Sequence, residues 1–251
     1  MGFLDTAPLG PQRDEAIARI RKAPPGLEVA RYWHHVAAAT PDSAKRLLSY
    51  IASALLARGW LQPTDRVLES ATETLGEEAA QIKADFDILV AADLVTLDGP
   101  KIVCLAGLLC TKPTGILFKF EGQHEVHVAG PLAAIAIGKA LQKSGEIRAV
   151  CAEDKATKLV LKCDTAGITE RTPEETCLFL QAWTGDTTPT AVMAQGGFFR
   201  DDDALGRWQE SAGDPNGMPL ASMLFGMAVG DLGQEVGAAL ESVLNHLPDF
   251  D

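Results

Sequence analysis

The chain has 251 residues, of which 47% are hydrophobic and 22% charged, and its formal net charge is −12. This is the composition of an ordinary globular protein, long enough for one sizeable core or two modest ones. The negative charge argues against nucleic acid and anionic membrane surfaces as partners, because both bind clustered lysine and arginine.

No apolar run approaches the roughly 20 residues of a membrane span. The N-terminus has no basic patch followed by a long apolar stretch, so a secretory signal is not expected. The cysteines are odd in number and widely spaced, at Cys104, Cys110, Cys151, Cys163 and Cys177. Without a Cys-x-x-Cys pair they indicate neither a zinc knuckle nor a disulfide framework. We therefore expect free thiols in a reducing cytoplasm, with no metal or cofactor.

The first part of the chain predicts helices. A short one is expected over Asp14–Lys22, before a proline-rich break. A stronger one begins after Thr40, a good capping residue, and ends at Gly59. A third is expected over Glu77–Asp93, where apolar residues recur at helical spacing.

A strand–turn–strand pattern over residues 94–103 follows these helices, and this order is typical of a winged helix. Such domains often bind DNA. Here the third helix carries only Lys83 as a basic residue, against five acidic ones. A helix for the major groove needs donors for bases and positive charge for phosphates. We therefore interpret residues 1–97 as a helical, winged-helix-like scaffold rather than a DNA-binding region.

Residues 98–251 are predicted to form an α+β core. The expected strands are Ile116–Phe120, Val126–Val128, Ile147–Ala152, Leu159–Cys163, Cys177–Trp183 and Val192–Arg200. The expected helices are a buried one over Pro131–Leu141 and two others over Asp201–Trp208 and Leu232–His246. Asp201–Asp203 could be ligands of a hard cation, but such a run more often caps the helix that follows it.

Several short matches resemble the organomercurial (alkylmercury) lyase family over approximately residues 50–240. They are the Thr111–Thr114 loop leading into Gly122–His127, the strand, cysteine and hairpin of Val150–Val160, Phe198-Phe199 followed by Trp208, and Leu232–Glu235. The resemblance implies a helical region packed on a mixed or antiparallel sheet core.

The family's mechanism uses two cysteine thiolates, which bind a soft metal, and an aspartate, which protonates the leaving carbon. The resemblance places Gly130 and Met193 at the cysteine positions and Ala133 at the aspartate position. Glycine and alanine are neither nucleophiles nor proton donors, so carbon–mercury cleavage is not expected. These three positions are instead predicted to line a smaller, less polar pocket for a small organic substrate.

Three reactive residues remain near that position. On a strand, Glu125 and His127 share one face while His124 points to the other, so an acid–base pair is predicted and a two-histidine metal site is not. Cys110 is a candidate nucleophile that Lys112 or His127 could activate. The alternatives are a solvent-exposed histidine at a strand edge and a free structural cysteine. The other four cysteines are expected to be small core residues.

The sequence thus predicts a lyase- or cyclase-type enzyme that acts by acid–base chemistry on a small organic metabolite. The alternative is a non-catalytic small-molecule, metal-binding or interaction protein on the same scaffold. No nucleic acid or membrane partner is expected, and the sequence does not indicate an oligomeric state.

Overall fold

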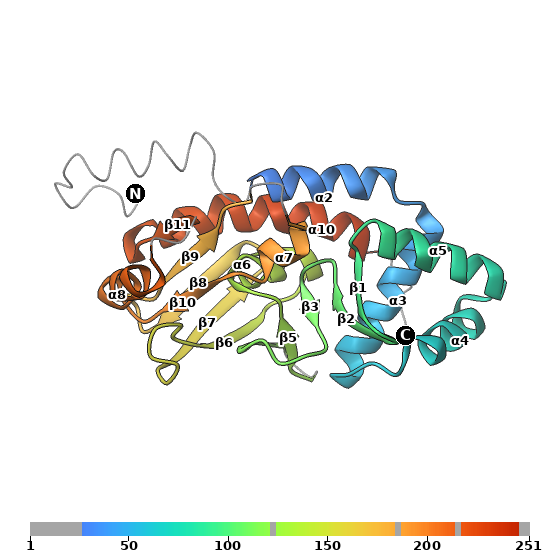
Figure 1. Cartoon of the computed structure of the whole chain (residues 1–251), viewed down its shortest axis with the longest axis horizontal. Helices are drawn as coiled ribbons and strands as arrows, with labels where there is room; N and C mark the ends of the chain where they lie inside the picture. The colour runs from blue at the N-terminus through green and yellow to red at the C-terminus, as the bar shows by residue number, and fades with distance from the viewer. Residues whose placement is uncertain (1–26, 121–123, 184–186, 214–216, 246–251) are drawn as a thin grey trace.

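The computed structural model describes residues 27–120, 124–183, 187–213 and 217–245. The predicted helix over Asp14–Lys22 lies outside them. Figure 1 shows α3, α4 and α5 at one end, the long strands at the other, and α2 beside α10 along one edge. Among the described helices, none combines the length and apolar character needed to cross a membrane.

The helices are α2 (Leu27–Ala39), α3 (Asp42–Arg58), α4 (Thr64–Leu75), α5 (Ala79–Ala91), α6 (Pro131–Leu141), α7 (Pro189–Met193), α8 (Asp202–Ala212) and α10 (Gln234–Leu244). Immediately before α10 come three short helical segments, η1 (Ser222–Leu224), α9 (Phe225–Ala228) and η2 (Val229–Gly233). The strands are β1 (Val95–Asp98), β2 (Lys101–Leu105), β3 (Leu109–Cys110), β4 (Ile116–Phe120), β5 (Val126–Val128), β6 (Gly145–Val150), β7 (Lys158–Asp164), β8 (Gly167–Thr172), β9 (Cys177–Gln181), β10 (Gly196–Phe199) and β11 (Gly217–Leu220).

The helical end confirms two predicted helices, α3 and α5, and adds α2 and α4, which the sequence patterns did not predict. Helix α3 ends at Gly59 in the left-handed conformation (φ 74°), as predicted. The predicted cap at Thr40 is wrong. Its hydroxyl donates to the Val36 carbonyl of α2 at 2.7 Å, because α2 reaches almost to this residue, and Pro41 takes the capping position.

The strands form two sheets. The larger has the order β1-β2-β3-β5-β4-β6-β7-β8 with antiparallel pairs throughout, and the smaller has the order β10-β9-β11. The β1–β2 hairpin, predicted as a wing, forms one edge of the larger sheet. The predicted boundary between residues 97 and 98 falls inside β1. The winged helix and the division into two regions therefore stay predictions.

Helix α6 lies at the centre of the core, as predicted for Pro131–Leu141. All of its residues except Lys139 are buried, and it packs against α10 and against strands of both sheets. The predicted strand over Val192–Arg200 is wrong in its first part. Thr188 caps the short helix α7 by accepting a hydrogen bond from the Ala191 amide, and only β10 is extended.

Candidate functional site

The larger sheet has one apolar face and one polar face. Phe118, Ile147 and Leu161 lie opposite one another on successive strands and are fully buried. Leu117 and Arg148, also opposite one another, are half-buried on the other face. Because side chains alternate along a strand, each residue opposite Leu117 belongs to that second face.

A row of reactive side chains continues this second face. His127 lies opposite Leu117, Cys110 opposite His127, Cys104 opposite Cys110, and Thr96 opposite Cys104. We call Thr96, Cys104, Cys110 and His127 the thiol row. Both ends of the row carry a buried polar atom without a hydrogen-bond partner, namely the Thr96 Oγ1 and the His127 Nδ1. Buried polar groups in native proteins are rarely unpaired, so such a group calls for an explanation.

The two thiols interact directly. Their Sγ atoms are 3.3 Å apart, within hydrogen-bond distance. The hydrogen bond with the Cys104 thiol lowers the pKa of Cys110 below its ordinary value. The same hydrogen bond and burial raise the pKa of Cys104, although the Gly107 amide partly offsets this rise. Cys110 is therefore the sulfur that ionises first, and the thiolate is the nucleophilic form of cysteine.

The remaining cysteines are core residues, as predicted. Cys151, Cys163 and Cys177 are buried, and all five thiols are free. Burial raises the pKa of Cys163 to about 11 and raises that of Cys177 even further. The Cys177 thiol also donates to the Asp201 carbonyl at 3.2 Å. Cys163 and Cys177 are thus protonated near neutral pH and less reactive than Cys110.

Glu125 interacts with Arg148 rather than with His127. Its carboxylate accepts from the Arg148 guanidinium at 2.5 Å in a partly exposed ion pair, and the structure records no hydrogen bond from Glu125 to His127. Lys112, considered above as an activator of Cys110, instead pairs with Asp98. The structure therefore brings Cys110 and His127 together, whereas Glu125 and Lys112 have partners of their own.

Gly130, Ala133 and Met193, the positions that the resemblance aligns with the family's reactive residues, are tightly packed. Gly130 is extended (φ −171°), and a Cβ added there would lie 2.2 Å from the Met193 carbonyl oxygen. Ala133 and Met193 are fully buried, and the Met193 Sδ accepts a hydrogen bond from the Trp33 Nε1 at 3.2 Å. Backbone therefore occupies the space that a side chain at position 130 would need.

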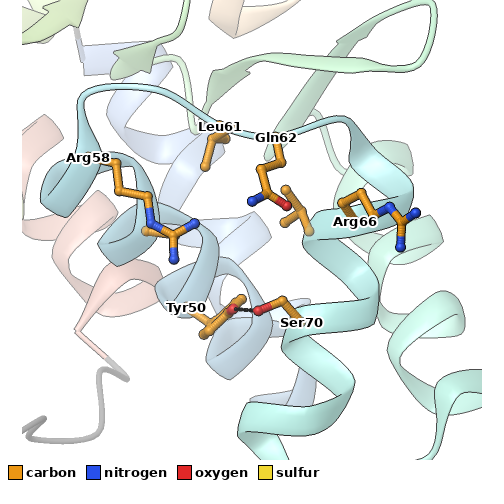
Figure 2. A pocket seen from close by; sticks show the side chains of 8 residues that line it. Tyr50, Arg58, Leu61, Gln62, Arg66 and Ser70 are labelled. Atoms are coloured by element: carbon orange, nitrogen blue, oxygen red, sulfur yellow. Dashed lines mark hydrogen bonds between the residues drawn. The ribbon is translucent and has the colours of Figure 1, made fainter.

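One surface hollow lies between α3 and α4 (Figure 2). Gln62 extends toward the space between the helices, and a hydrogen bond between the Tyr50 and Ser70 hydroxyls closes its lower side at 2.7 Å. The space inside is about 10 Å³, which is room for roughly one water molecule. None of the predicted site residues lines this hollow, and room for about one water molecule is too little for an organic substrate.

One group among the described residues has the spacing of a metal site. The ligand atoms of Cys151, Glu153 and Asp154 lie within 4.8 Å of one another. The carboxylates are already engaged, because Asp154 accepts from the Thr157 amide and hydroxyl, and both acids pair with Arg200. These contacts account for the close approach of the Glu153 and Asp154 carboxylates without a bound ion.

The aspartate run behaves as a helix cap, as predicted. Asp201 accepts a hydrogen bond from the Ala204 amide at 2.7 Å, at the start of α8. Asp202 accepts from the Ser222 amide at 2.8 Å and thereby ties α8 to η1.

A solved structure identifies the architecture. The mercury-bound form of MerB2 is 17% identical to this chain, the match covers 87% of this chain and 99% of that one, and the TM-score is 0.63. The chain has a MerB-like fold. No family model matches the sequence, and no curated protein does so either. The MerB-like fold confirms the predicted combination of helices with a mainly antiparallel sheet core, and at this identity it shows the fold alone.

Sequence reasoning singled out Cys110 and His127 but missed the contact between Cys104 and Cys110. The available signal was the short turn Ala106–Leu108 between two apolar runs, which predicts a hairpin. A hairpin over this turn places Cys104 opposite Cys110.

Proposed function

We propose that the protein is a lyase-type enzyme on a MerB-like scaffold and that it acts on a small organic molecule at the thiol row. The observation that carries the proposal is the register of β3 and β5, which sets Cys110 directly opposite His127. Opposite residues of an antiparallel pair project from the same face with their side chains in reach of each other. A thiolate and an imidazole are then available at one place.

The two side chains have complementary chemistry. Cys110 ionises first because the Cys104 thiol stabilises its negative charge. The unpartnered Nδ1 of His127 is able to accept or return a proton. Together they form a nucleophile and an acid–base group, which is the minimum for eliminating or transferring a leaving group. Glu125 stays outside this pair because it binds Arg148.

Carbon–mercury cleavage is not part of the proposal. Gly130 and Ala133 have no reactive group, and Met193 binds Trp33 through its sulfur. Close packing at Gly130 and Met193 also argues against placing the substrate there. We therefore place the substrate at the half-buried His127 side of the thiol row.

The test does not require a candidate substrate. Purified protein is incubated with the small-molecule fraction of a cell extract, and mass spectrometry follows which masses fall and which appear. We expect a substrate–product pair that disappears with Cys110→Ser and with His127→Gln but persists with Cys163→Ser, the matched control for loss of a buried thiol. Turnover that survives both site variants would contradict the proposal, as would the absence of turnover in the wild type.

A second candidate is binding of a thiophilic metal without catalysis. The two sulfur atoms at 3.3 Å favour it, since soft cations prefer thiolates, and MerB2 was solved in a mercury-bound form. Titration with mercuric ion, followed by the ultraviolet absorbance of sulfur–mercury bonds, should then show one equivalent bound. Cys104→Ser and Cys110→Ser should remove this binding, whereas Cys177→Ser should keep it. A wild-type protein that binds no mercuric ion rejects this candidate.

A further inference from the structure

The Cys104–Cys110 pair occupies a position in the sheet that brings side chains together. The Thr111 amide donates to the Val103 carbonyl at 3.1 Å, so the residues at 103 and 111 form a hydrogen-bonded pair. Bonded and non-bonded pairs alternate along an antiparallel ladder, so Cys104 and Cys110 form a non-hydrogen-bonded pair. The α-carbons of such pairs are roughly 4.5 Å apart.

This spacing suits a covalent link between the sulfurs. Disulfides need α-carbons roughly 4.4–6.8 Å apart, so the backbone of the pair is already within range. The Sγ atoms are in contact at 3.3 Å, and small side-chain rotations suffice to join them. The strands therefore hold the two thiols ready for oxidation.

The surroundings make the two sulfurs unequal. Cys110 borders His127, which is half-buried and carries the unpartnered Nδ1 atom. Cys104 lies one strand further from His127, next to the Gly107 amide, and is 6% exposed against 9% for Cys110. Cys110 is thus the sulfur nearer to the half-buried His127, which lies opposite it on the adjacent strand.

We propose that Cys110 and Cys104 form a redox-active dithiol that reduces a small organic hydroperoxide. The Cys110 thiolate attacks the terminal peroxide oxygen and the O–O bond breaks. The alcohol leaves with the proton that Cys110 gave up, returned through His127, and Cys110 becomes a sulfenic acid. The Cys104 thiol then attacks the Cys110 sulfur, which forms the S–S bond and releases water. The two thiols lose two electrons and two hydrogens in total, and an external dithiol restores them.

A preassembled three-ligand metal site is the main alternative for the same residues. Within the described ranges, the only group of this kind with all ligand atoms within 4.8 Å is Cys151, Glu153 and Asp154. Cys104, Cys110 and His127 do not meet this spacing. The contact between the two sulfurs thus favours disulfide formation over a three-ligand metal site.

Tryptic peptides of the full-length protein report each thiol separately. The Lys112–Pro113 bond resists trypsin, so Cys104 and Cys110 stay together on the peptide of residues 102–119. Cys151 and Cys163 each lie alone, on the peptides of residues 149–155 and 163–171. Reduced, metal-free protein is treated with one equivalent of tert-butyl hydroperoxide, alkylated with iodoacetamide, digested and analysed by mass spectrometry.

We expect the peptide 102–119 to lose two hydrogens and to escape alkylation, at least about tenfold faster than the peptide 163–171 is oxidised. One equivalent of tert-butyl alcohol should appear, and dithiothreitol should reverse the change. The experiment uses no other substrate, so its outcome does not depend on the proposed lyase activity. A peptide 102–119 that stays fully alkylatable, or that is oxidised no faster than the control peptides, would overturn the proposal.

Two variants test the order of the steps. In Cys104→Ser, oxidation of Cys110 should stop at the sulfenic acid, which dimedone traps. In Cys110→Ser, Cys104 should react no faster than Cys163. A faster reaction of Cys104 in that variant would overturn the assignment of Cys110 as the attacking sulfur.

Discussion

Two neighbouring regions of the molecule differ in how they use their space. The first is the junction between β5 and α6, where Gly130 contacts the Met193 backbone so closely that no side chain fits. In the thiol row, Cys104 and Cys110 contact each other while His127 keeps an unpartnered nitrogen. The regions meet at Gly107, because its amide contacts Cys104 and a Cβ there would lie 2.9 Å from the Met193 Sδ.

The difference teaches where chemistry is available on this scaffold. A reactive side chain needs an unpaired hydrogen-bonding atom or a shifted pKa, and it needs access from solvent. The junction has neither, because Met193 is fully buried and its sulfur already accepts a hydrogen bond. The thiol row has both, because the Cys104 thiol lowers the pKa of Cys110 and His127 is half-buried.

The largest expected effect comes from Gly130→Ala. The added methyl group collides with the Met193 carbonyl, so we expect the free energy of unfolding to fall by about 3 kcal/mol, the upper end of the usual cost of overpacking a core. Urea denaturation measures the change. Gly206→Ala is the matched control, because nothing lies within 4 Å of its added Cβ in the middle of α8, and it should stabilise the protein slightly. Equal effects of the two substitutions would refute close packing at the junction.

Met193→Leu should cost about 1–2 kcal/mol of unfolding free energy. Leucine keeps the volume but leaves the buried Trp33 Nε1 without an acceptor. In the Trp33→Phe background the same change should cost less, since the donor is gone. A double-mutant cycle of urea denaturation curves measures the coupling. A coupling energy near zero would show that the indole–sulfur contact does not stabilise the junction.

The pH dependence of alkylation should distinguish the thiol row from an isolated buried thiol, that of Cys163 on β7. The pKa of Cys110 is lowered, so its thiolate forms at lower pH than that of Cys163, whose pKa is about 11. Iodoacetamide rates followed from pH 6 to 11 should therefore rise first for Cys110. Cys104→Ala removes the hydrogen bond and should raise the pKa of Cys110, with a rate loss of about threefold to tenfold near neutral pH. An unchanged profile would contradict stabilisation of Cys110 by Cys104.

The smallest effect is expected for Glu125→Gln. The Glu125–Arg148 ion pair is partly exposed, and such pairs contribute roughly 0–1 kcal/mol. We expect urea midpoints and the Cys110 alkylation profile to stay close to the wild type. A clear shift of the alkylation profile would instead place Glu125 in the acid–base group with His127.

Much of the fold was predictable from local patterns. The buried helix α6 and the strands β4 and β5 have the predicted bounds, because their apolar residues and flanking prolines and glycines define them locally. Helix α2 was missed, although Val29, Trp33 and Val36 follow helical spacing. The helical start of Val192–Arg200 was missed because valine and methionine in a short run do not distinguish a helix from a strand.

The sequence by itself determined the α+β class, because local periodicity suffices for it. Its resemblance to the organomercurial lyases indicated the MerB-like core, and residue chemistry singled out Cys110 and His127 as candidates. The tertiary structure alone decided that Cys104 pairs with Cys110, that Glu125 binds Arg148, and that Met193 closes the junction at Gly130. These contacts depend on strand register and on packing between distant segments. A shift of one residue in register would turn each thiol to the other face of the sheet.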